Sequence, residues 1–127
     1  MALGKESGEF SFKVTSTTFS ETGAAERGGF HVQINLLGTA TGGTVEGTLT
    51  LTGEPGAKSG TGSFRGANFL DDGNIISGTG EGTWETVGKH KWRIRGINYR
   101  SDGSTVASDG ELVLATQSYQ GKLYEWN

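Results

Sequence analysis

The sequence predicts one all-β domain over residues 1–127, a single closed antiparallel up-and-down barrel of about eight strands. Glycine supplies 23 of the 127 residues, against only 1 proline and with no collagen-like period. Apolar and polar residues alternate with a period of two in one window after another, and no window keeps helical spacing. Short turn signals separate these windows, and closure into a barrel removes unpaired edge strands.

The strands are assigned from one turn signal to the next. Residues 20–28 hold enough alanine and glutamate for one helical turn, although a loop is the better interpretation. Turns or loops at 42–43, 53–56, 71–74 and 101–104 divide the rest of the chain. The predicted strands are 8–19, 29–37, 44–52, 59–70, 74–87, 89–100, 105–116 and 119–126.

The hairpin between the fifth and sixth predicted strands supports the barrel. A three-residue loop centred on Gly88, with Gly88 at positive φ, places Trp84 opposite Trp92 and Glu81 opposite Arg95. Both faces of the hairpin then carry compatible pairs. A two-residue loop would exchange inside and outside, which a half-buried strand does not tolerate.

Glycines also occupy the expected inner face, where Gly78, Gly80 and Gly82 share parity with Ile76 and Trp84. Such a row permits sharp coiling beside large rings, or it enlarges a cavity, and the sequence leaves both open. A barrel of about eight strands is just wide enough to be filled by side chains or to hold one small ligand. The inward side chains are expected to include Phe10, Phe12, Phe30, Phe64, Trp84, Trp92, Ile94, Leu112 and Leu114.

The charge pattern argues against nucleic acid as a partner. The chain has 11 basic and 14 acidic side chains, a net charge of −3, whereas phosphate-backbone binding needs clustered cations. A basic row on the sixth predicted strand has carboxylates on both neighbouring strands, so exposed ion pairs are expected there. The basic row is Lys89, Lys91, Arg93 and Arg95, and the carboxylates are Glu81, Glu85, Asp109 and Glu111.

Several site classes are disfavoured by composition. The chain has no cysteine and only two histidines, which excludes a disulfide framework and a three-histidine zinc site. We expect neither a metal nor a cofactor. Residues 1–10 lack an apolar signal region, and no apolar run approaches the ~18 residues of a membrane helix. A cytoplasmic protein without a membrane partner is therefore expected.

Polar residues on the inward parity are the candidates for orienting a ligand. His90 shares parity with Trp92 and is expected near the barrel mouth, with a rim histidine as the alternative. Asn98 and Asn68 must find hydrogen-bond partners, either on a ligand or on backbone at a bulge. No catalytic residue is identified. The candidate ligand-binding residues are Trp84, Trp92, Asn98, His90, Phe64, Asn68 and Phe12.

Three segments within this meander carry a family resemblance: Gly82-Thr83-Trp84, the Trp-Arg-Ile-Arg-Gly run at 92–96, and the closing run at 121–126. With the short strands around them they resemble small lipocalin-like barrels, in particular the allene-oxide-cyclase-like barrels of uncharacterised bacterial proteins. The resemblance implies binding of an apolar small molecule or, as in the cyclases, steering of a reactive one through ring closure.

Three functions follow as hypotheses. The first is a small-molecule-binding barrel whose aromatic interior takes an apolar or aromatic ligand. The second is a cofactor-free isomerase or cyclase in the same cavity, which requires His90, Tyr99 or Tyr119 to face it. The third is a non-catalytic homo-oligomeric module with a filled core. Its expected outer-face contacts are Ile97, Val113 and Ala115.

Overall fold

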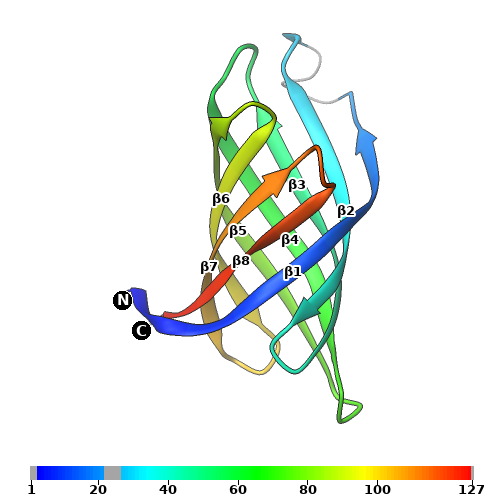
Figure 1. Cartoon of the computed structure of the whole chain (residues 1–127), viewed down its shortest axis with the longest axis vertical. Helices are drawn as coiled ribbons and strands as arrows, with labels where there is room; N and C mark the ends of the chain where they lie inside the picture. The colour runs from blue at the N-terminus through cyan, green and yellow to red at the C-terminus, as the bar shows by residue number, and fades with distance from the viewer. Residues whose placement is uncertain (1–2, 22–26, 127) are drawn as a thin grey trace.

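The computed structural model describes residues 3–21 and 27–126 and has the form of a closed barrel (Figure 1). Each strand pairs antiparallel with its neighbour in the chain, and β1 pairs with β8 to close the sheet. The strands are β1 (Leu3–Phe19), β2 (Phe30–Ala40), β3 (Gly43–Gly53), β4 (Ser59–Leu70), β5 (Ile75–Gly88), β6 (Lys91–Arg100), β7 (Thr105–Val113) and β8 (Ser118–Trp126). The all-β, closed eight-stranded prediction is confirmed.

The strand assignments agree with the sequence prediction except at some ends. β1 begins five residues earlier than expected, at Leu3, and β2 continues to Ala40. The turn between β2 and β3 uses Gly42 at a φ of 76°, a left-handed conformation that glycine adopts without steric cost. β7 ends at Val113 and is followed by a turn. Most of the loop predicted at 20–28, namely residues 22–26, lies outside the described residues.

Alternate residues of every strand fill the barrel interior. The pairing register stacks Ile34 beside Leu49 and Leu49 beside Phe64, so apolar residues from three strands meet at one level. Aromatic rings pack on the β1–β8 side, where the Phe10 centroid lies 4.9 Å from that of Tyr119. The buried apolar residues are Phe10, Phe12, Val32, Ile34, Leu36, Val45, Leu49, Leu51, Trp84, Ile94, Val106, Ala107, Leu112, Tyr119 and Leu123.

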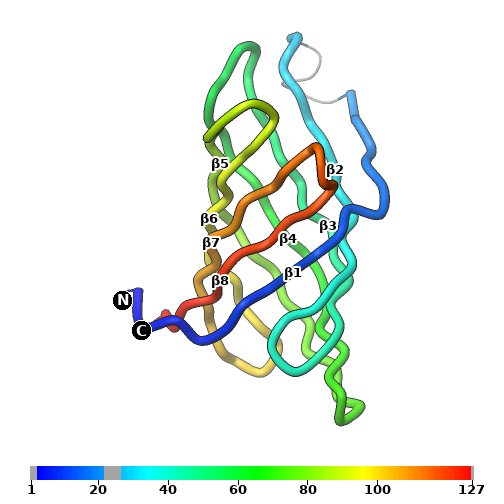
Figure 2. Tube along the Cα trace, viewed as in Figure 1, coloured from blue at the N-terminus to red at the C-terminus, as the bar shows by residue number. Residues whose placement is uncertain are grey.

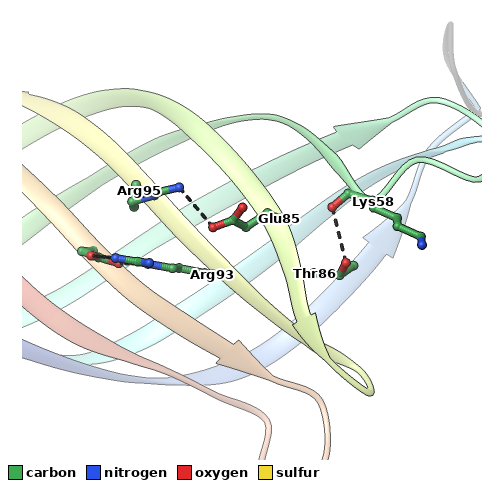
Figure 3. A network of polar contacts seen from close by, with 6 residues as sticks. Lys58, Glu85, Thr86, Arg93 and Arg95 are labelled. Carbon is green, nitrogen blue, oxygen red and sulfur yellow. Dashed lines mark hydrogen bonds and ion pairs between the residues drawn. The ribbon is translucent and has the colours of Figure 1, made fainter.

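The outer face of β5, β6 and β7 carries two ion pairs of the expected kind, made by Arg93 and Arg95 (Figure 3). Arg93 binds Asp109 through two nitrogens at 2.9 and 2.6 Å, and Arg95 reaches Glu85 at 3.1 Å. The hydrogen bond from Arg93 and its positive charge lower the pKa of Asp109 below its ordinary value. The four side chains are 30–52% exposed, so solvent screens the charges and each pair adds little to stability.

The predicted register of the β5–β6 hairpin is wrong by two residues. Trp84 lies opposite Ile94, and Arg95 lies opposite Thr83. The left-handed turn residue is His90, at a φ of 55°. Gly88 still belongs to β5 and pairs with Lys91, beyond a register shift between Thr86 and Gly88. Because the error is an even number of residues, it keeps every side chain on its correct face. The inside and outside assignments on β5 and β6 therefore survive.

An irregular pairing in β1 changes which side chains face inward at one end of the barrel. The register shifts between Val14 and Ser16, and beyond the shift Thr17 pairs with Ile34 and Phe19 with Val32. A bulge of this kind inserts one extra residue and reverses the parity of the strand that follows. Within the described part of the chain, no helix is long and apolar enough to cross a membrane.

Candidate functional site: two chambers in one barrel

The two ends of the barrel differ in which connections they carry. The Cα trace in Figure 2 shows the β2–β3, β4–β5 and β6–β7 turns at the lower end, as drawn, and the β3–β4, β5–β6 and β7–β8 turns at the upper end. Leu3 of β1 pairs with Trp126 of β8 towards the lower end. Each end opens into its own chamber, here called the upper chamber and the lower chamber.

The upper chamber is an apolar cup with about 330 Å³ of open space. Its rim is exposed: Phe19 is 77% accessible and Leu114 is 49% accessible. Polar side chains in the lining come from Thr17 and Gln117 alone, within the described ranges. The lining is Val14, Thr17, Phe19, Phe30, Val32, Ile34, Leu51, Trp84, Trp92, Leu112, Val113, Leu114 and Gln117.

The β1 bulge builds one wall of this cup. Without it, Ser16 and Thr18 would continue the inward parity of Phe12 and Val14. The extra residue turns Thr17 and Phe19 inward instead, opposite the inward residues of β2. An aromatic ring at the rim is therefore a direct product of the bulge.

A buried layer of Leu49, Leu51, Trp84 and Ile94 closes the floor of the cup, and this layer is called the partition. Leu51 and Trp84 line the upper chamber, whereas Leu49 and Ile94 line the lower one. Leu49 and Leu51 are successive inward residues of β3, and Trp84 pairs directly with Ile94. The two chambers have no lining residue in common. The barrel therefore encloses two spaces.

Trp84 is fixed in the partition by a hydrogen bond and by a glycine beneath its ring. Its indole Nε1 donates to the carbonyl oxygen of Thr52 at 3.0 Å, two strands away. The ring crosses Gly60, where an added Cβ would lie 2.6 Å from that nitrogen. Phe30 packs beside the ring at a tilt of 40°, with ring centroids 5.3 Å apart. Only 2% of Trp84 is exposed.

The lower chamber is smaller and more polar, with about 190 Å³ of open space. Phe12 and Phe64 supply apolar surface, and Asn68, Asn98 and Ser108 supply polar atoms from three different strands. Outward residues such as Ser63 and Glu81 also border this space, since inward glycines leave only backbone in the wall of β4, β5 and β6. The backbone of these strands therefore forms part of the chamber wall.

The two asparagines of the lower chamber make different hydrogen bonds. Asn98 Nδ2 donates to the Ser108 hydroxyl at 3.1 Å, and its Oδ1 occupies the space that a Cβ on Gly80 would take. Asn68 Nδ2 donates to the carbonyl of Thr41 at 3.3 Å. The Asn68 Oδ1 is buried and has no hydrogen-bond partner among residues 3–21 and 27–126. A buried acceptor of this kind normally has a partner.

Arg100, the last residue of β6, brings a positive charge to this chamber. It has the same parity as Asn98, lines the chamber, and is half-buried. An added Cβ on Gly78 would lie 3.9 Å from its Cγ, so the stem of Arg100 runs beside β5. The ion pairs found in the described part of the chain do not include Arg100. Its charge contributes to lowering the pKa of Asp102, after the hydrogen bonds from Ser104.

Tyr119 is the tyrosine that faces the lower chamber. It is buried, and burial raises the pKa of its phenol well above the ordinary value. The group is therefore protonated at neutral pH and is suited to donate a hydrogen bond rather than to act as a base. Tyr99 lies on the outer face, 54% exposed.

The candidate residues predicted from the sequence do not converge on one cavity. Trp84 and Trp92 line the upper chamber, while Phe12, Phe64, Asn68 and Asn98 line the lower one. His90 is exposed on the β5–β6 turn and lines neither. The inward placement is wrong, because the turn begins two residues later than predicted and takes His90 out of the strand; its exposed position at the end of the barrel agrees with the alternative of a rim histidine.

The sequence-based candidates did not include two further residues that line the chambers, Arg100 and Phe19. Arg100 has the same parity as Asn98, so counting one step further along the strand would have found it. Phe19 could not be found by parity, because the bulge reverses it. Among the residues expected on an outer contact face, Ile97 and Val113 are half-buried and Ala115 lies exposed in the β7–β8 turn.

Comparisons of this chain with protein-family models, with curated proteins and with solved structures gave no match. The closed eight-stranded antiparallel barrel is the architecture that the structure shows, and it is compatible with a lipocalin-like barrel.

Proposed function

We propose that this protein is a small-molecule-binding barrel of lipocalin-like type, whose upper chamber takes an apolar or partly aromatic ligand. The observation that carries the proposal is an open cup of about 330 Å³ lined almost wholly by apolar side chains, with Phe19 and Leu114 exposed at its rim. Exposed apolar surface around a concavity is a common property of ligand-binding clefts.

The lining also defines the class of ligand. Trp92 of β6 and Phe30 of β2 supply aromatic surface from strands on opposite sides of the closed sheet. Polar contacts are limited to the side chains of Thr17 and Gln117. Covering apolar surface contributes about 25 cal/mol for each Å² removed from water. A ligand rich in hydrogen-bonding groups would leave those groups unpaired in this cup, at a cost in affinity. Ligands of one or two fused or linked rings fit these conditions best.

Binding can be tested with N-phenyl-1-naphthylamine, an uncharged two-ring fluorescent probe. We expect saturable enhancement of its fluorescence together with quenching of the protein tryptophans by energy transfer, since Trp84 and Trp92 line the cup. A linear, unsaturated response up to the solubility limit of the probe would overturn the proposal.

A rim substitution locates the probe. Leu114→Asp places a carboxylate at the mouth of the cup, at a position exposed enough to leave folding intact. We expect it to weaken probe binding at least about tenfold, which corresponds to ~1.4 kcal/mol. Phe69→Asp is the matched control, because Phe69 is an exposed apolar residue on the outer face that lines neither chamber. Equal losses in the two variants would contradict binding in the cup.

A further inference from the structure

We propose that the upper end of the barrel docks on an anionic lipid membrane, with the mouth of the upper chamber facing the lipid. Exposed apolar side chains at the mouth enter the headgroup region, and lysines beside them bind the negative headgroups. Peripheral docking of this kind needs no membrane-spanning segment. It differs from the sequence-based expectation of no membrane partner, which rested on the lack of such a segment.

Three large apolar side chains are exposed at this end. Phe19 ends β1, Leu114 follows β7, and Val87 lies near the end of β5. Phe19 and Leu114 also line the upper chamber, so they mark its opening. Exposed apolar surface that gathers in one region is typical of sites where a protein contacts another protein or a membrane. Insertion into lipid would remove these side chains from water.

The β5–β6 turn places two lysines beside Leu114. The backbone nitrogen of Leu114 donates to the carbonyl oxygen of His90 at 3.1 Å, so the β5–β6 and β7–β8 turns are in contact. Lys89 and Lys91 flank His90 in the chain, and both are exposed. An apolar side chain thus lies next to a turn with two positive charges. This combination suits an anionic bilayer, in which negative headgroups lie above hydrocarbon.

The β3–β4 turn adds a third lysine. The backbone nitrogen of Thr86 donates to the carbonyl oxygen of Lys58 at 2.9 Å, which places Lys58 beside Thr86 and close to Val87. Figure 3 shows the Lys58 side chain extending away from Thr86. None of the three lysines has an ion-pair partner among residues 3–21 and 27–126. Their charges are therefore available to an external anion.

The lower end of the barrel has the opposite charge. Its turns carry Asp71, Asp72 and Asp102, and the chain as a whole has a net charge of −3. Arg100 at the same end is half-buried and lines the lower chamber. Phe69 is exposed there too, but it lies two residues from Asp71. An anionic surface therefore attracts the upper end and repels the lower one, which orients the barrel as it approaches.

The combination of charge and apolar surface favours lipid over other partners. A nucleic acid would bind the lysines through its phosphates but would leave Phe19 and Leu114 exposed to water. A second copy of this chain, joined through the same end, would bring like charges together. A bilayer with anionic headgroups satisfies both features at once.

Docking in this orientation gives the upper chamber a direct path to the bilayer. An apolar ligand then passes between lipid and protein without being released into water, where its apolar surface would be hydrated. This exchange rests on the proposed function of the upper chamber, whereas docking rests on the residues around its mouth.

Sedimentation with lipid vesicles tests docking. The probes are vesicles of phosphatidylcholine alone and of an equal mixture of phosphatidylcholine and phosphatidylserine. We expect binding to the mixed vesicles to be at least about tenfold stronger, and to weaken as salt screens the charges. Equal binding to both, or no binding to the mixed vesicles, would overturn the proposal. No vesicle binding together with a dimer in light scattering would assign the apolar rim to a second copy instead.

Substitutions at the two ends locate the contact. Lys89→Gln should weaken binding to the mixed vesicles about fivefold, whereas Lys5→Gln, an exposed lysine at the lower end, should leave it unchanged. Val87→Asp should weaken it at least about tenfold, because it removes an apolar group and adds a negative charge. Phe69→Asp is the matched control at the lower end. Equal losses in the two members of either pair would contradict docking through the upper end.

A single fluorescent label reports the orientation, because the natural chain has no cysteine. Ala115→Cys on the β7–β8 turn and Asp71→Cys on the β4–β5 turn each allow attachment of nitrobenzoxadiazole. Mixed vesicles should shift the label emission at residue 115 to shorter wavelength and leave that at residue 71 in place. A shift at residue 71 alone, or at neither position, would overturn the orientation.

Docking and ligand binding are separated by one variant and one probe. Val87 lines neither chamber, so Val87→Asp should lose vesicle binding yet keep saturable binding of N-phenyl-1-naphthylamine in solution. Probe binding by the natural protein without vesicle binding would overturn docking and leave the proposed function standing. Vesicle binding without probe binding would support docking and remove ligand exchange.

Discussion

The upper and lower halves of this barrel are built from the same eight strands with the same period-two pattern, yet their interiors differ in chemistry. In the upper half the inward positions hold rings and branched chains such as Trp84, Trp92 and Leu112. In the lower half rings such as Phe12 and Phe64 are interspersed with glycines and polar groups, among them Gly78 and Asn98. Closure of the barrel therefore leaves the chemistry of each end free to be set by a few inward residues.

The glycine row of β5 shows how this change is made along one strand. At Gly82 an added Cβ would collide with the backbone of Arg95, so this glycine permits close approach of β6. At Gly80 it would collide with the Asn98 amide, and at Gly78 its nearest neighbour is 3.2 Å away. Near the partition the glycine row thus allows β5 and β6 to pack closely, and towards the lower end it leaves open space in the chamber. Both roles expected from the sequence, close coiling and a larger cavity, therefore occur along the same strand.

The partition carries the largest expected effect. Trp84→Ala removes the ring that separates the chambers and its hydrogen bond to Thr52, and should lower the free energy of unfolding by about 3–5 kcal/mol. Trp92→Ala, a half-buried ring in the upper chamber, is the control and should cost less than half as much. Guanidinium unfolding followed by circular dichroism measures both. Equal losses of unfolding free energy in the two variants would contradict the prediction that Trp84 in the partition stabilises the fold more than Trp92 does.

Two glycines sharpen the difference between the halves. Gly60→Ala puts a methyl group under the Trp84 ring and against the Thr52 carbonyl, and overpacking of this kind should cost about 1–3 kcal/mol. Gly78→Ala should stay within about 1 kcal/mol of the natural protein, because its added methyl meets only one backbone oxygen that must yield slightly. Urea unfolding of both variants gives the comparison. A larger loss in Gly78→Ala would show that the lower half is as tightly packed as the upper.

The Arg93–Asp109 ion pair on the outer face should contribute least to the free energy of unfolding, and its contribution should depend on pH. Arg93 lowers the pKa of Asp109, so the pair stabilises the folded state above the ordinary aspartate pKa of about 3.9 and loses this effect as pH falls through the lowered value. Asp109→Asn should therefore cost about 0–1 kcal/mol at pH 7 and nothing in strong acid.

Urea unfolding of this variant at several pH values, beside Glu111→Gln on the same outer face, measures the Asp109 contribution. The stability difference between the natural protein and Asp109→Asn should shrink steadily as the pH is lowered. A difference that grows in acid would have the wrong sign for a lowered carboxylate pKa.

The sequence was sufficient for the architecture because alternation and turn residues are local signals. The parity of Trp84, Ile94 and Asn98 follows from counting along a strand, and an even error in the hairpin register does not disturb it. The glycine turn at Gly42 was equally visible, since glycine adopts its left-handed φ without steric cost.

The site could be predicted only in part, because chambers arise from features that a single strand does not show. The β1 bulge that turns Phe19 inward depends on pairing with β2, and no pattern within residues 8–19 announces it. The division by the partition depends on Trp84 crossing Gly60 to reach β3. His90 was misplaced for a related reason: which residue of a turn takes the left-handed conformation depends on the pairing on both sides.

The seam between β1 and β8 also has a consequence for how the chain folds. Seven of the eight strand pairings join segments that are adjacent in the chain, so each can form as a local hairpin at a small entropic cost. The eighth joins Leu3 to Trp126 and must wait until nearly the whole chain is ordered. The two chambers therefore exist only once this last seam has closed, because an open sheet encloses no interior.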